Sequence, residues 1–128
     1  MPMAIAKKGD RITATDTHLV ISPSGGPPVP VPLPYDGVLE KELSCDVYAE
    51  HQPVAILGSV AVMKPGHQVA PNSFSKPPSN EGRVFAGAST VFANGKPIAR
   101  NGDVAITCND PTDLPVGKVV ASGTVHSG

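Results

Sequence analysis

Hydrophobic residues along this chain occur in short runs divided by glycine, proline and asparagine, a pattern that predicts short strands joined by tight turns. The clearest unit runs from Val91 to Asp103. Its first three residues, Val-Phe-Ala, favour a strand, and Asn94-Gly95 favours a tight turn because both residue types accept positive φ angles. Ile98-Ala99 begins the returning strand, and Gly102-Asp103 turns the chain again. This unit is typical of a β-hairpin followed by a second turn.

Two earlier segments repeat this unit in weaker form. Residues 47–59 align with residues 91–103, and residues 5–10 align with residues 98–103. We therefore predict three copies of one unit, of which the first is truncated. A unit of this size cannot bury its apolar side alone, so the copies are expected to stack around a common axis.

The stretch between the first and second copies gives further predictions. Arg11–His18 is rich in threonine and predicts an exposed strand, and a short strand follows at Leu19–Ile21. Alternating prolines in the insertion 22–34 exclude a central strand, because proline has no N–H to donate, and favour a stiff extended arm lying on the domain. A ligand for a small proline-binding adaptor domain is the alternative for this run. Tyr35–Leu43 is the one segment that predicts a helical turn.

Composition favours a small all-β protein. The 128 residues suffice for a single domain, 1–128, with a modest core. The 13 glycines and 15 prolines approach a level typical of disorder, but a hydrophobic content of 40% argues against disorder. Tryptophan is absent, so small and β-branched residues must fill the interior. The insertion 71–82 predicts a surface loop, and 118–125 predicts the last strand.

Charge and cysteine content exclude several classes of partner. The net charge of -1 gives no electrostatic reason to expect a nucleic acid or an anionic membrane. We expect a cytoplasmic protein without a signal peptide, or one that leaves by a route that needs none, because the longest apolar run, Val54 to Met63, is about half of the ~20 residues needed to cross a bilayer. Cys45 and Cys108 are too few for a disulfide framework and favour free thiols or metal ligation.

Superposing the three copies identifies a candidate metal site. His18 and His67 occupy one position of the repeat, and Cys108 lies in the corresponding turn of the third copy. Corresponding turns of stacked repeats meet at one end, so these three side chains should converge. His126, on the final strand, is the available fourth ligand. Three imidazoles and one thiolate form a closed tetrahedral set, which suits one structural zinc ion per chain.

The remaining histidine and cysteine have ordinary interpretations. His51 falls on the hairpin turn of the second copy and should point to solvent. Cys45 lies at a strand entry, where a small buried thiol is usual. The chain has no Cys-x-x-Cys or His-x-x-x-His spacing, so the metal prediction depends on the repeat alignment. A disulfide between Cys45 and Cys108 remains open and would remove the metal site.

Several segments resemble a known family. Lys96–Asp103 and Ile5–Asp10 resemble the proline-alanine-alanine-arginine (PAAR) repeat, and Ala86–Gly95 resembles the strand and turn that precede it. The resemblance covers nearly the whole chain apart from the two insertions. PAAR proteins are small β-rich cones that cap the spike of contractile injection machines, such as type VI secretion systems and phage-tail-like particles. Their zinc lies near the point, and their wide base docks on a trimeric β-helical spike.

The resemblance implies a fold, a set of ligands and partners for this chain. The fold would be an all-β, repeat-built cone with a pseudo-threefold arrangement, held together by a metal near the tip. The zinc ligands would be His18, His67, Cys108 and His126. One copy would cap a trimeric spike of the valine-glycine-repeat or phage tail-spike type, with effector cargo and a target membrane as further contacts. The protein would be made in the cytoplasm and delivered outside the cell by the machine.

Two other classes of function compete with a mechanical spike tip that has no catalytic activity. One is a small hydrolase using His18 or His67 with Asp103 or Asp16, although no motif pairs a nucleophile with a base. The other is a proline-rich interaction module on a β scaffold. Both competitors predict a protein without stoichiometric zinc.

Overall fold

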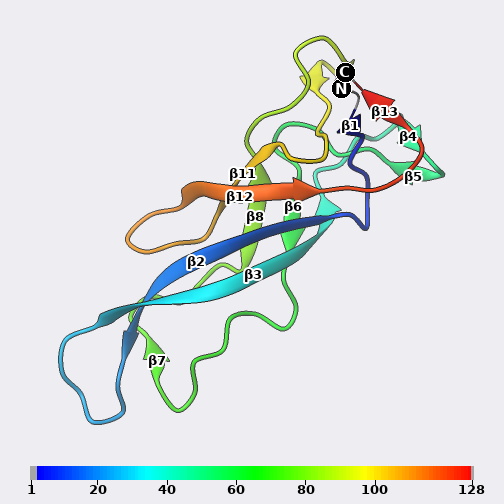
Figure 1. Ribbon diagram of the computed structural model, residues 1–128. Helices are drawn as coiled ribbons and strands as arrows, with labels where there is room; N and C mark the ends of the chain where they lie inside the picture. Colours follow the sequence, from blue (N-terminus) through cyan, green and yellow to red (C-terminus); the bar gives the residue numbers. More distant parts are fainter. Residues whose placement is uncertain (1–2, 128) are drawn as a thin grey trace.

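A computed structural model describes residues 3–127 and shows an all-β protein that tapers from a wide end to a narrow end (Figure 1). No helix occurs among these residues. The strands are β1 (Met3–Ala4), β2 (Arg11–Ile21), β3 (Val29–Lys41), β4 (Tyr48–Ala49), β5 (Gln52–Pro53), β6 (Val60–Val62), β7 (Ser73–Phe74), β8 (Glu81–Val84), β9 (Phe92–Ala93), β10 (Lys96–Pro97), β11 (Val104–Thr107), β12 (Leu114–Val120) and β13 (His126–Ser127).

Six strands close into an antiparallel barrel. β2 pairs with β3, β3 with β6, β6 with β8, β8 with β11, β11 with β12, and β12 returns to β2. Successive side chains of a strand point to opposite faces, so one face of each strand fills the interior. The large residues that fill it, each at most 2% exposed, are Ile12, Tyr35, Leu39, Val84 and Val119. Glycine leaves room for them, since a Cβ on Gly82 would lie 3.2 Å from the ring of Tyr35.

Three turns with the same hydrogen-bond pattern lead into three of the barrel strands. They span residues 7–10, 56–59 and 100–103, directly before β2, β6 and β11. In each turn the N–H of the fourth residue donates to the carbonyl of the first, and a side-chain oxygen of the fourth accepts the N–H of the first. The third residue is a glycine with φ of 95°, 91° or 90°. Ser59 can replace the aspartate of the other turns because its hydroxyl also accepts.

Three buried alanines join the segments that enter these turns. Ala6 N–H donates to the carbonyl of Ala99, Ala99 N–H to that of Ala55, and Ala55 N–H to that of Ala6, each at 2.9 Å. All three alanines are 0% exposed. The three segments are therefore hydrogen-bonded in a closed cycle, which we call the alanine ring.

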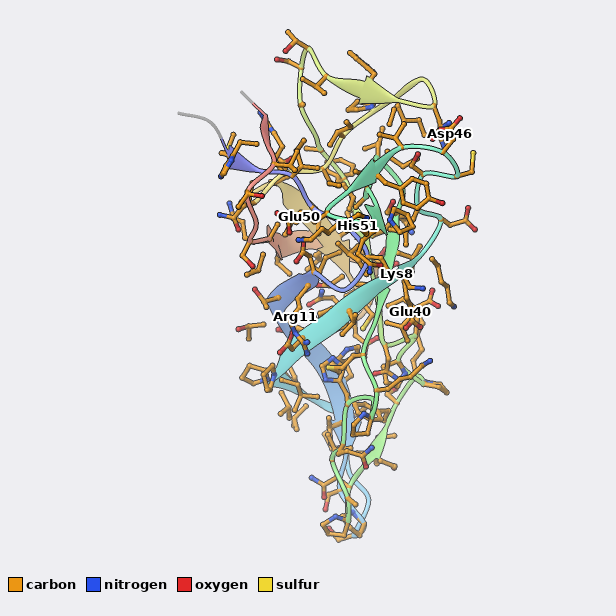
Figure 2. The ribbon with its side chains drawn as sticks, turned by 90° about the vertical axis from the view of Figure 1, so that its right-hand side faces the viewer. Lys8, Arg11, Glu40, Asp46, Glu50 and His51 are labelled. Carbon is orange, nitrogen blue, oxygen red and sulfur yellow. The ribbon has the colours of Figure 1, made fainter. Side chains whose placement is uncertain are left out.

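Three short strand pairs lie at the wide end, beyond the alanine ring. Two are hairpins, β4–β5 and β9–β10, and the second has the predicted turn with φ of 53° at Asn94 and 78° at Gly95. The prediction for His51 is also confirmed, because it is exposed in the turn of the first hairpin. The third pair joins the chain ends, with Ala4 of β1 opposite His126 of β13. Figure 2 shows Glu50 and His51 nearer to the wide end than Arg11, the first residue of β2.

Three predictions between the first and second copies are wrong. Tyr35–Leu43 is not a helical turn, because residues 35–41 continue β3 with alternately buried and exposed side chains. The proline-rich run is not an arm resting on the domain either, since β3 begins at Val29 and pairs with β2 from Val29 opposite Val20 to Val38 opposite Arg11. β2 itself is one long strand in place of the two that were predicted.

The narrow end is an extension of three strands beyond the barrel. The β2–β3 hairpin projects away from the wide end, and β7 lies beside it (Figure 1). β7 lies within the segment 71–82 that was predicted as a loop, and it pairs through Phe74 opposite Val20. Both insertions therefore contribute strands to the narrow end.

Two adjacent valines of β12 should contribute differently to the free energy of unfolding, because only one of them points into the barrel interior. Val119 is 1% exposed and Val120 is 45% exposed. We expect Val119→Ala to lower the free energy of unfolding by about 2 kcal/mol, because it removes two buried methyl groups and leaves a cavity. The matched change Val120→Ala should alter it by less than about 0.5 kcal/mol. Urea denaturation measures both, and equal losses would contradict the barrel arrangement.

Candidate metal centre

Two of the candidate ligands lie on one face of β2. Asp16 and His18 are two residues apart on this strand, so their side chains point to the same side, which is the interior. Asp16 is 0% exposed and His18 is 1% exposed. A carboxylate and an imidazole this deeply buried need partners, because burial removes both from water.

Two further ligands come from segments that adjoin the barrel. His67 follows β6 and is held by its backbone N–H, which donates to the side chain of Asn80 at 2.9 Å. Cys108 directly follows β11 and is buried. His67 Nε2 lies 2.9 Å and Cys108 Sγ lies 3.4 Å from the same atom, Asp16 Oδ2. The other oxygen, Asp16 Oδ1, accepts a hydrogen bond from the hydroxyl of Thr107 at 2.5 Å.

The four side chains could hold a metal ion. One ligand atom from each of Asp16, His18, His67 and Cys108 lies within 4.8 Å of the others. Around a tetrahedral ion with bonds of about 2.0–2.3 Å, ligand atoms lie roughly 3.3–3.8 Å apart. Small shifts of the side chains would suffice, in which Asp16 and His67, now 2.9 Å apart, separate and the more distant ligand atoms move inward. With Asp16 and Cys108 ionised, a divalent ion would leave the buried group without net charge, which limits the cost of burying it.

His18 gives an independent test of this fit. Neither of its ring nitrogens has a hydrogen-bond partner among the described residues. Asp110 Oδ2 lies 3.4 Å from Nδ1, within ion-pair range but without hydrogen-bond geometry. An unsatisfied buried polar group costs about 1–3 kcal/mol, and a metal bound to one of these nitrogens would remove that cost. The buried histidine therefore fits the role of a ligand.

The protonation of Cys108 depends on the same surroundings. Burial, followed by the charge of Asp16, raises the pKa of the Cys108 thiol to about 11. The thiol is therefore protonated at neutral pH when no ion is bound. Metals bind the thiolate, so an ion entering the site must displace this proton. Burial also raises the pKa of Tyr35, whose ring lies 6.1 Å from that of His67 and whose hydroxyl donates to the carbonyl of Ala61.

The structure brings together three of the four residues that the sequence predicted as ligands. His18, His67 and Cys108 converge, but His126 does not join them. His126 is exposed on β13, which lies at the wide end (Figure 1). Its Nδ1 lies 3.1 Å from the carbonyl oxygen of Thr124. The fourth member of the group is Asp16. The sequence could have identified Asp16, because side chains alternate between the two faces of a strand, and residues two apart such as Asp16 and His18 share one face.

Other candidate residues lie elsewhere. Cys45 is exposed, so its predicted burial is wrong, and it is a free thiol like Cys108. The buried residue at this point is Ser44, directly before Cys45. The hydroxyl of Ser44 donates to the side chain of Asn94. Asp103 accepts hydrogen bonds from Arg100 in its own turn, and no ion pair with a histidine is recorded for it among the described residues.

A cavity of about 230 Å³ adjoins the metal group. Its lining includes Cys108, Asn109, Asp110 and the segment 76–79. The cavity therefore lies on the side of the group that Cys108 occupies.

Comparisons with family models, curated proteins and solved structures found no match for this chain. Residues 3–127 contain no helix of the length and apolar character needed to span a membrane.

The two cysteines provide a matched test of the metal centre. We expect the wild-type protein to bind one divalent transition-metal ion, and Cys108→Ser to weaken binding at least about tenfold because a hydroxyl is a poorer ligand than a thiolate. Cys45→Ser should leave the affinity unchanged, since Cys45 is exposed and outside the group. Competition with a chromophoric chelator measures the affinities. Equal effects of the two substitutions would exclude this site.

The raised pKa of Cys108 predicts how binding depends on pH. Below the folded pKa of about 11 the free thiol carries a proton that the ion must displace, so affinity should rise with pH through the neutral range. One displaced proton corresponds to about a tenfold rise per pH unit. Titrations at about pH 7 and about pH 8 measure this slope, and the Cys108→Ser variant should have a shallower one. A slope that the substitution leaves unchanged would mean that the thiolate is not a ligand.

Proposed function

We propose that this protein is a spike tip of a contractile injection machine, such as a type VI secretion system or a phage-tail-like particle. In this role one copy caps the blunt end of a trimeric β-helical spike and sharpens it for passage through a membrane. The role is mechanical and requires no catalysis. The observation that carries the proposal is the alanine ring, because a closed cycle of three equal backbone contacts is what a single chain needs in order to match a trimer.

The three segments of the alanine ring are proposed to be repeats about an approximate threefold axis. Each turn is followed by a barrel strand and receives the same set of backbone hydrogen bonds. Gly9, Gly58 and Gly102, the third residues of the turns, donate to the carbonyls of Leu39, Val84 and Val119 on β3, β8 and β12. These correspondences are what a repeat that continues into the barrel would produce, and they support the proposed likeness to PAAR proteins.

The taper of the molecule supports a tip with its base at the three strand pairs. The wide end carries β1–β13, β4–β5 and β9–β10, and the narrow end is the β2–β3 extension (Figure 2). The metal group lies along β2 on the way to this narrow end. A structural ion there would tie β2 to the segments that follow β6 and β11.

We propose zinc as the ion. The donors are one carboxylate oxygen, two imidazole nitrogens and one thiolate, which are the ligand types that zinc accepts in tetrahedral sites. Four protein ligands leave no open position, which is typical of a structural site. Structural zinc can contribute on the order of 10 kcal/mol of apparent free energy to a small fold. A narrow protein driven through a membrane would benefit from that stability.

A proline-binding partner is the weaker alternative. The proline-rich run is held as a β-strand against β2, with a period of two residues, whereas adaptor domains recognise the three-residue period of a polyproline II helix.

The spike-tip proposal has two further parts. The protein would be secreted from the cytoplasm through the machine, and effector cargo would be carried with the tip.

Stoichiometry tests the proposed function. We expect one chain to bind one spike trimer from the same genome, because three equivalent contacts in one chain replace three separate copies. Native mass measurement of the purified complex gives the ratio. Binding should depend weakly on salt, since a chain with a net charge of -1 offers little electrostatic steering.

Three tips on each trimer, or no complex at all, would contradict the proposal. A variant with Pro30, Pro32 and Pro34 changed to alanine serves as the control for the alternative function. It should still bind the trimer, whereas loss of binding in this variant would favour the proline-rich interaction module.

A further inference from the structure

Three residues at the wide end occupy corresponding positions in the hydrogen-bond pattern. Val54 N–H donates to the carbonyl of Val47, Ile98 N–H to that of Val91, and Ile5 N–H to that of Val125. The residues that follow these three carbonyls are Tyr48, Phe92 and His126. We call these three residues the basal trio.

The strand pairing gives the same correspondence. Tyr48 lies opposite Pro53, Phe92 opposite Pro97, and His126 opposite Ala4. The carbonyls of these opposing residues accept hydrogen bonds from Lys8, Leu57 and Asn101, which are the second residues of the three turns. The third strand pair is therefore formed by the two chain ends. In it, β13 corresponds to the first strand of each hairpin, and β1 corresponds to the second.

All three side chains of the basal trio face solvent. Tyr48 is 59% exposed, Phe92 is 54% exposed, and His126 is also exposed. Exposed aromatic rings are not needed for the core, which in this region is formed by Ala49, Ala93 and their neighbours. Aromatic residues are over-represented among the side chains that dominate binding energy at protein interfaces.

We infer that the basal trio is the contact surface for a threefold-symmetric partner, with each ring entering one of three equal apolar sites on the end of a homotrimer. This inference rests on the proposed function and names the residues that would carry the docking. A symmetric trimer fits because it offers the same site three times, and one rigid chain that fills all three at once gains from their proximity. Tyr48 and Phe92 present larger apolar rings than His126, so they contribute more to the binding.

The assignment also accounts for the position of His126. Its ring lies away from the metal group because β13 pairs with β1 at the wide end. Its place in the hydrogen-bond pattern is that of an aromatic residue in both other strand pairs.

Alanine substitution of the basal trio tests the inference against a matched control. Phe85 is 55% exposed, close to the 54% of Phe92, but it directly follows β8, its N–H donates to the carbonyl of Val104 on β11, and it belongs to none of the three strand pairs. We expect Tyr48→Ala and Phe92→Ala each to weaken binding to the purified spike trimer by about tenfold, and His126→Ala by a few-fold. Phe85→Ala should change the affinity by less than about twofold. Titration calorimetry with the full-length chain measures all four.

The outcomes separate this inference from the function on which it rests. If the wild-type chain does not bind the trimer, the spike-tip proposal fails. If the wild-type chain binds but the three substitutions in the basal trio weaken binding no more than Phe85→Ala does, the spike-tip proposal stands and the inference is overturned. Urea denaturation of each variant, which should match the wild type because these side chains are exposed, excludes unfolding as the cause.

A second copy of this chain is the other partner that could cover the basal trio, and sedimentation detects it. Sedimentation of the isolated wild-type protein should give a monomer. A dimer that Tyr48→Ala and Phe92→Ala convert to monomer would show that the basal trio serves self-association, and would also overturn the inference.

Discussion

The alanine ring is the contact on which the rest of the structure depends. Three backbone segments meet so closely that each donates one N–H to the next and accepts one in return, and their side chains have no contact with solvent. A larger side chain at Ala6, Ala55 or Ala99 would have to displace a neighbouring backbone, because protein interiors are close-packed. The ring fixes the start of β2, β6 and β11, and those strands with their partners close the barrel.

A barrel with so little apolar material gains modest stability from burial alone. Its core contains one tyrosine and a few aliphatic residues, with alanines filling much of the rest. The metal group lies where the barrel continues into the narrow extension, and it joins β2 to the segments that follow β6 and β11. Small folds often need such a metal or a disulfide, and the two cysteines of this chain are both free.

The sequence predicted local structure well where a turn depends on specific residues. Asn94-Gly95 and the glycines of the three turns lie at positive φ, as expected from residues that tolerate it. The convergence of His18, His67 and Cys108 was also predicted, but from equivalent turns, whereas His18 lies within β2 and the other two residues follow β6 and β11. His126 was assigned by elimination, and only the pairing of the two chain ends, which no local pattern encodes, explains its position at the wide end. Asp16 was not predicted as a ligand, because the threonine-rich segment Arg11–His18 predicted an exposed strand, whereas Asp16 is 0% exposed.

Alternating prolines exclude a central strand but not an edge strand, so the prediction of an arm outside the sheet is wrong for the proline-rich run. Leu39 exchanges backbone hydrogen bonds with residues 9 and 10, so the odd-numbered residues of β3 bond toward β2. Pro30, Pro32 and Pro34 therefore face the outer edge, where β6 does not reach because it pairs only with Val38–Lys41.

An edge without N–H donors cannot readily template another strand, so the long hairpin can project without promoting aggregation. Residues 19–35 and 68–75, which form much of this projection, contain no charged side chain. In the proposed role this matters because each charge taken from water into an apolar layer would add a large desolvation cost. In that proposed role the prolines would protect the edge of the sheet, and the absence of charge would ease the entry of the same hairpin into a membrane.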